Sequence, residues 1–184
     1  MYIYPSGASA RDVYDRLMRA DPAYGATNHG HGTEQLCRGY KSLLDVGCGR
    51  SRYTLEVQRR YGLKIAACDL SPVAVETQRA NGVTAREADL SVGLPYFDDE
   101  FEVVSCFDTL EHIQTSSIHT ALRELGRVAS ELVIMRIAYR PAVLTGINGE
   151  DLHLTVASEG WWLEQINQYI GKPVQILNAI VVEL

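Results

Sequence analysis

The sequence has few lysines, few cysteines and no long apolar run, and each shortage excludes a class of protein. Its 184 residues carry a formal net charge of −6 and four cysteines. Broad binding to a phosphate backbone depends on clustered Lys and Arg, so the acidic balance argues against it, without excluding a nucleic-acid substrate. The cysteines show no C-x-x-C spacing. We therefore expect reduced thiols, with neither a disulfide nor a zinc site.

The apolar runs are too short to cross a membrane. Two of the longest, 132–135 and 179–182, fall far short of the roughly 20 residues that a membrane helix needs. The first residues lack the basic flank and apolar stretch of a secretory signal. We therefore expect a cytoplasmic protein. The length fits one domain, which we place over 1–184, with an N-terminal helix and loop in 1–41 and the core in 42–184.

The sequence does contain an alternation of short apolar runs with helical patterns. Strands are expected at 43–46, 65–68, 83–88, 101–107 and 132–137, with helices at 9–20, 54–61, 71–82, 118–128 and 159–169. Residues 23–33 are expected to form a loop, and 174–184 one long strand or a tight pair. Alternation with short connections implies a mostly parallel sheet covered by helices on both faces, which is a doubly wound α/β sandwich.

The turn after the first strand has the composition of a ligand-binding loop. In Asp45-Val46-Gly47-Cys48-Gly49, the two glycines let the backbone turn sharply and let a ligand approach it closely. Ligands of such sheets bind beyond the carboxyl ends of the strands. A dinucleotide loop would read G-x-G-x-x-G, yet position 52 is Arg. Asp45, two positions before the first glycine, suits a ligand with an ammonium group, and S-adenosylmethionine is such a ligand.

Two later carboxylates fit a nucleoside. Asp69 ends the second strand, where it can accept both ribose hydroxyls or cap the helix that begins near Ser71. That spacing fits NAD as well as S-adenosylmethionine. Asp89 ends the third strand and is placed to accept from the adenine amine, while Leu90 can flank the ring. This second carboxylate favours the methyl donor.

Four stretches resemble the successive motifs of class I S-adenosylmethionine-dependent methyltransferases: LLDVGCGRSRYTLEV, IAACDLSPVAVETQRA, AREADLSVGLPYFDDEFEVVSCFDTLEHI and HLTVASEGWWLEQI. The resemblance implies a Rossmann-like sheet of six or seven strands in the order 3-2-1-4-5-7-6, with the last hairpin shortened or the seventh strand lost. It assigns cofactor binding to Asp45, Gly47, Cys48, Gly49, Asp69, Leu70, Asp89, Leu90 and Phe107.

The run that leaves the fourth strand is the candidate catalytic segment. Asp108, Glu111 and His112 lie where methyl acceptors dock in this family, so His112 could remove a proton from the acceptor. Packing and the start of a helix explain this run equally well. Some family members hold a divalent metal with a similar acidic-x-x-Glu-His cluster, to which His153 could add a ligand. Asp108 stands in place of the usual Glu and shortens the reach, so no metal is assigned.

Further polar residues could belong to the acceptor site. His29 and His31 could line it or lie in an exposed turn, and Arg136 and Arg140 could hold an anionic acceptor or form surface ion pairs.

The sequence therefore predicts an enzyme that uses S-adenosylmethionine, releases S-adenosylhomocysteine and methylates an unidentified acceptor, for which a small molecule is favoured. A nucleic-acid or protein acceptor and the oligomeric state are left open. The alternatives are a cofactor-binding regulatory or partner subunit without activity, a metal-assisted RNA or quinone O-methyltransferase, and an NAD-dependent enzyme.

Overall fold

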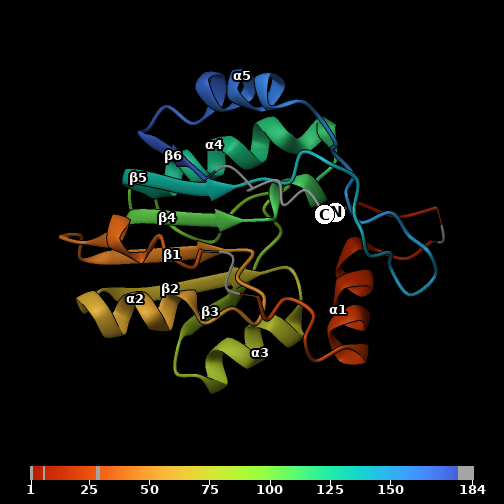
Figure 1. Ribbon diagram of the computed structural model, residues 1–184, viewed down its shortest axis with the longest axis horizontal. Helices are drawn as coiled ribbons and strands as arrows, with labels where there is room; N and C mark the ends of the chain where they lie inside the picture. Colours follow the sequence, from red (N-terminus) through yellow and green to blue (C-terminus); the bar gives the residue numbers. More distant parts are fainter. Residues whose placement is uncertain (1, 6, 28–29, 178–184) are drawn as a thin grey trace.

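Six parallel strands form a single sheet in the order β3-β2-β1-β4-β5-β6 (Figure 1). The computed structural model describes residues 2–5, 7–27 and 30–177. The strands are β1 (Ser42–Val46), β2 (Lys64–Asp69), β3 (Thr84–Glu87), β4 (Phe101–Phe107), β5 (Ala129–Arg136) and β6 (Val174–Ile176). The sheet confirms the expected Rossmann-like fold.

Helices cover both faces of this sheet, as Figure 1 shows. The helices α2 (Tyr53–Tyr61) and α3 (Pro72–Ala80) cover one face, and α4 (Ile118–Val128) and α5 (Glu159–Tyr169) cover the other, while α1 (Ala10–Ala20) lies at the carboxyl edge. Short 3-10 turns are η1 (Glu34–Cys37), η2 (Leu110–His112) and η3 (Thr115–Ser117). Successive strand residues face opposite sides, because the side-chain period of a strand is two. Leu44 and Val46 therefore pack with α4 and α5, whereas Leu43 packs with α2 and α3.

The predicted elements agree closely with the observed ones. The predicted helices 118–128 and 159–169 and the predicted strand 101–107 have the observed bounds. The helix α1 begins as expected, because the Ser9 side chain accepts a hydrogen bond from the Asp12 backbone N–H at 3.1 Å. Gly62 ends α2 in the left-handed region, with φ 74°. The strand β5 differs, since it starts at Ala129, three residues before the predicted start.

The far edge of the sheet is simpler than the order 3-2-1-4-5-7-6. The first five strands follow that order, but β6 pairs in parallel with β5, with Val174 opposite Val133, at the place of the seventh strand. The described residues contain no seventh strand. Of the strand or pair expected at 174–184, only Val174–Ile176 is observed as a strand, and 178–184 lie outside the described residues.

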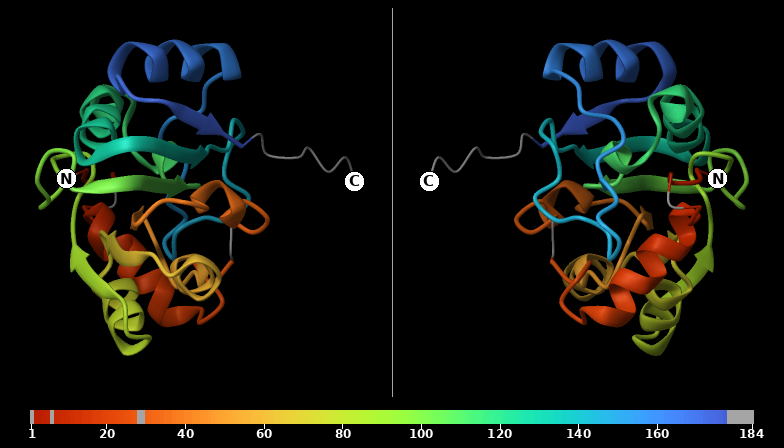
Figure 2. Two further views of the ribbon diagram at one scale, coloured as in Figure 1. Left: turned by 90° about the vertical axis from the view of Figure 1, so that its left-hand side faces the viewer. Right: turned by 90° about the vertical axis from the view of Figure 1, so that its right-hand side faces the viewer.

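The N-terminal segment covers the carboxyl edge of the sheet, together with the chain that follows β5. The right-hand view of Figure 2 looks on to this edge, with α1 in front. Tyr4, Ala8 and Val13 share an apolar cluster with Leu152 and Ala142. The four cysteines are buried and free. No helix in the described part of the chain is long and apolar enough to cross a membrane.

Candidate functional site

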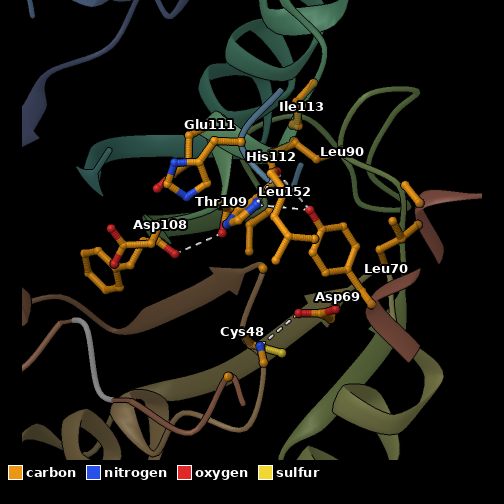
Figure 3. Close-up of a pocket in the computed structure, with 18 of the residues that line it drawn as sticks. Cys48, Asp69, Leu70, Leu90, Asp108, Thr109, Glu111, His112, Ile113 and Leu152 are labelled. Carbon is orange, nitrogen blue, oxygen red and sulfur yellow. Dashed lines mark hydrogen bonds between the residues drawn. The ribbon is translucent and has the colours of Figure 1, made fainter. Parts of the chain in front are cut away.

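A cavity of about 500 Å³ lies at the carboxyl ends of the strands, under this cover (Figure 3). Ligands of doubly wound sheets bind at this edge. The cavity is lined by all twelve residues that the sequence proposes for cofactor binding or catalysis: Asp45, Gly47, Cys48, Gly49, Asp69, Leu70, Asp89, Leu90, Phe107, Asp108, Glu111 and His112. The fold therefore brings twelve residues from four separate segments together.

The glycine loop is hydrogen-bonded to β2 and packs closely against Thr109. The Gly47 and Cys48 backbone N–H groups donate to the Cys68 carbonyl at 2.9 and 3.2 Å, which fixes the loop to β2. Gly47 has φ 72°, and a Cβ there would overlap the Thr109 side chain. Any side chain at position 47 would thus be strained and would displace the start of the candidate catalytic segment.

The buried Asp45 and the partly buried Asp69 lie under this loop. Asp45 is 3% exposed and accepts a hydrogen bond from the Ser105 hydroxyl at 2.6 Å. Burial raises the pKa of Asp45 to about 7, and the neighbouring Asp69 carboxylate adds to the rise. Asp69 accepts from the Gly49 and Ser71 backbone N–H groups, each at 2.8 Å. Asp69 thus orders both the glycine loop and the start of α3 while lining the cavity.

The raised pKa of Asp45 predicts a pH dependence of stability. The folded, ligand-free protein keeps a proton on Asp45 that the unfolded chain loses above its ordinary pKa of 3.8. The folded state therefore binds more protons between pH 3.8 and about 7, and its stability falls as pH rises through that window. The variant Asp45→Asn cannot titrate. The unfolding free energy of the variant minus that of the wild type should therefore increase by about 1.4 kcal/mol for each pH unit within this window.

Urea unfolding of both proteins at several pH values measures this difference. Only the change of the difference with pH is used, so any constant effect of the substitution cancels. Parallel pH curves for the two proteins would contradict the prediction.

Asp108 and Arg136 form an ion pair at the end of β4 and β5. The Arg136 Nε lies 2.9 Å from Asp108 Oδ2, and Asp108 has the unusual φ of 44°. Of the two arginines proposed for an anionic acceptor, Arg136 is thus engaged with Asp108. Arg140 lines the cavity instead.

Glu111 and His112, like Asp45, have strongly shifted pKa values. Glu111 is fully buried; its Oε1 accepts from the Ala138 N–H at 3.0 Å, and its Oε2 has no hydrogen-bond partner among the described residues. Burial, with help from the Asp108 charge, raises the pKa of Glu111 to about 8. Burial lowers the pKa of His112 to about 4. At neutral pH the carboxyl is therefore protonated and the imidazole is neutral.

The tautomer of His112 follows from its partner. Its Nδ1 lies 2.8 Å from the Leu152 carbonyl, which can only accept, so Nδ1 carries the proton and Nε2 keeps a lone pair. The Nδ1 of His153 lies 2.6 Å from the Arg140 carbonyl, which fixes that ring in the same way. Ligating atoms of Glu111, His112 and His153 lie within 4.8 Å of one another. Asp108, which the sequence placed in such a cluster, is not part of this group.

Sequence reasoning missed several groups around His112. The Tyr14 hydroxyl, on α1, lies 3.0 Å from His112 Nδ1 across 98 positions of sequence.

Of the two histidines proposed near the N-terminus, His29 lies outside the described residues. His31 does not line the cavity and lies 3.7 Å from Glu34 instead.

The comparisons with known proteins agree with this site. A family model described as a methyltransferase domain matches residues 43–131, which include the glycine loop, Asp69, Asp89 and His112. The chain belongs to the class I S-adenosylmethionine-dependent methyltransferase family.

Two curated relatives of this chain illustrate the range of acceptors named within the family. A norajmaline N-methyltransferase of Rauvolfia serpentina is 30% identical over 110 residues, covering 54% of this chain and 37% of the relative. A ribosomal protein L11 methyltransferase of Burkholderia cenocepacia is 25% identical over 173 residues, covering 88% and 57%. The chain thus spans less than two thirds of the length of either relative.

Solved structures share the fold. A Haloferax volcanii methyltransferase in complex with the Trm112 methyltransferase activator has a TM-score of 0.66 at 17% identity, covering 88% of this chain and 75% of that one. A phosphoethanolamine N-methyltransferase of Haemonchus contortus, in complex with S-adenosylhomocysteine and phosphomonomethylethanolamine, has a TM-score of 0.68 at 16% identity, covering 90% and 45%.

Proposed function

We propose that this chain binds S-adenosylmethionine in the cavity and transfers its methyl group to a small-molecule acceptor. One observation carries the proposal. Five carboxyl side chains and a single guanidinium line the cavity, from Asp45, Asp69, Asp89, Asp108, Glu111 and Arg140. Such a cavity suits a ligand with a sulfonium and an ammonium group. It opposes the diphosphate of NAD, because its ionised carboxylates repel a further negative charge in a low-dielectric site, even though Glu111 is protonated at neutral pH and Asp45 is partly so.

The residues present fit the methyl donor. Asp69 would hold the ribose hydroxyls, Asp89 the adenine amine and Leu90 the adenine ring, while Phe107 and Leu70 supply apolar walls. The loop of Gly47, Cys48 and Gly49 presents backbone to the ligand. S-adenosylmethionine supplies a methyl group that is already activated for displacement.

The chain's own residues would orient the reactants, exclude water and accept one proton from the acceptor. The cover formed by α1 and the segment after β5 keeps the acceptor in a confined space, and orientation of the reactants provides much of the acceleration. The Nε2 lone pair of His112 can accept a proton from an acceptor hydroxyl or amine, because the Leu152 carbonyl holds Nδ1 protonated. A neutral amine or a stabilised anion would need no base.

The norajmaline methyltransferase supports a small-molecule acceptor by its name, and the L11 methyltransferases support a protein acceptor by theirs. The partly covered, largely apolar cavity favours the first. Its acceptor half is formed by side chains of Tyr2, Tyr14, Ala142 and Leu152.

Calorimetry followed by label transfer tests the proposal. S-adenosylhomocysteine should bind and NAD should not. S-adenosylmethionine with a tritiated methyl group should then label the small-molecule fraction of a cell extract. Binding of S-adenosylhomocysteine with no label in any fraction would favour a regulatory subunit without activity. Binding of NAD without binding of S-adenosylhomocysteine would rule out S-adenosylmethionine as the ligand of this cavity.

A second candidate is a metal-assisted O-methyltransferase. Three observations favour it: the cluster of Glu111, His112 and His153, the unsatisfied Glu111 Oε2, and the two histidines whose Nδ1 atoms both donate to backbone carbonyls. Histidine ligands commonly have their second nitrogen engaged in this way. These side chains would hold a divalent ion, which would polarise the acceptor oxygen.

Titration calorimetry with Mn²⁺ and Zn²⁺ tests that candidate without any acceptor. One ion should bind per chain, and His153→Ala should weaken its binding at least tenfold. His119→Ala is the matched control, because His119 lies on α4 and does not line the cavity. If His153→Ala and His119→Ala bound the ion equally well, the metal-assisted mechanism would be ruled out.

A further inference from the structure

The mouth of the cavity carries apolar side chains that the protein leaves in water. Val143 is 85% exposed and Leu144 is 59% exposed, and both line the cavity together with Ala142 and Tyr2, which pack against one apolar cluster. Exposed apolar side chains are individually ordinary, but a contiguous group at the rim of a binding cavity marks a surface that a ligand covers. The apolar rim, meaning Tyr2, Ala142, Val143 and Leu144, therefore fits the body of an apolar molecule.

One cation stands beside the apolar rim. Arg140 is the single Lys or Arg among the described residues that line the cavity. No carboxylate of the described residues lies within ion-pair distance of it, in contrast to Arg136, which pairs with Asp108. The backbone of Arg140 is anchored, since its carbonyl accepts from His153 Nδ1 at 2.6 Å. A guanidinium on a fixed backbone offers a planar donor group for a carboxylate, sulfonate or phosphate.

The charges of the cavity fix the orientation of such a molecule. Asp45, Asp69 and Asp89 lie under the cofactor half of the cavity and would repel an anion there. An anionic group is therefore held at Arg140, and the opposite end of the molecule points towards His112. That arrangement would place the atom to be methylated beside the base and the charge at the mouth.

We propose that the acceptor is an apolar small molecule that carries one anionic group, which Arg140 binds while Val143 and Leu144 cover the apolar body. This inference rests on the proposed function, because it names the acceptor class of the same cavity. It makes Arg140 a residue that determines specificity rather than a catalytic residue.

Two fluorescent probes test the inference. Anilinonaphthalene sulfonate combines an apolar ring system with one anionic group, and phenylnaphthylamine has the same rings without the sulfonate. Each is titrated into the full chain with S-adenosylhomocysteine present in excess, so that the cofactor half is filled. The variants are Arg140→Gln, the double variant Val143→Ser with Leu144→Ser, and Arg38→Gln, an exposed arginine outside the cavity, as the control.

Arg140→Gln should lower the affinity for the sulfonate probe about tenfold and leave the affinity for the neutral probe unchanged. The double serine variant should lower the affinity for both probes, and Arg38→Gln should change neither. Equal effects of Arg140→Gln on the two probes, or none on either, would overturn the inference. So would full displacement of the sulfonate probe by S-adenosylhomocysteine. A wild type that binds the sulfonate probe through Arg140 but not S-adenosylhomocysteine would instead contradict the proposed function and leave the anion site standing.

Discussion

Replacing Asp69 by Asn should weaken the binding of S-adenosylhomocysteine by at least about a hundredfold. A hydrogen bond to a charged group contributes about 1.5–3 kcal/mol. Two ribose hydroxyls bound by this carboxylate therefore correspond to about 3 kcal/mol or more, and each 1.4 kcal/mol is a factor of ten. The amide also brings an N–H₂ group against the Gly49 or Ser71 backbone N–H, both of which the carboxylate now accepts. The loop loses its anchor at the same time.

Titration calorimetry measures this loss, and Glu87→Gln is the matched control. Glu87 ends the neighbouring strand β3 and pairs with Arg11 at the surface, outside the cavity. Its neutralisation should leave the affinity within a factor of two or so, because exposed ion pairs contribute little. Circular dichroism shows whether each variant is folded. A folded Asp69→Asn protein with unchanged affinity would remove Asp69 from the cofactor site.

The elements and the glycine loop could be predicted because their signals are local. Helix α1 has its Ser9 cap, α2 has Gly62, and β4 is a short, mostly apolar run. Parallel strands bring their carboxyl ends to one edge, so residues that directly follow strands meet there whatever the details of packing. This topological rule is why Asp69, Asp89 and His112 could be placed in one cavity from their positions alone.

The rest of the site depends on contacts between distant segments. Leu152, 40 positions from His112, fixes its tautomer through a backbone carbonyl, which carries no sequence signal. The pairing of Arg136 with Asp108 spans 28 positions, and two equally reasonable roles for Arg136 were open until the strands were placed. The parallel position of β6 beside β5 is likewise a matter of tertiary packing. A strand of three residues has no pattern that selects its neighbour.

Replacing His112 by Gln should lower the rate of methyl transfer by 10²- to 10⁴-fold, roughly the usual contribution of a general base, if the acceptor must lose a proton. Glutamine retains an N–H that can donate to the Leu152 carbonyl, so the fold and the affinity for S-adenosylhomocysteine should stay nearly unchanged. The readout is the initial rate of label transfer to the small-molecule acceptor found in the extract. His119→Gln, on α4 outside the cavity, should transfer at the wild-type rate.

The pH dependence separates a base from a residue that merely packs. Because burial lowers the pKa of His112 to about 4, its base form persists far below the ordinary histidine value of 6.5. Wild-type transfer that depends on this base should thus be flat from neutral pH down to about 5 and fall as pH approaches 4, while the residual activity of His112→Gln should lack that fall. A wild-type fall centred near 6.5 would mean that the imidazole is solvated during turnover. Equal rates for His112→Gln and wild type would assign the acceptor to the neutral amines or stabilised anions, for which positioning in the cavity alone suffices.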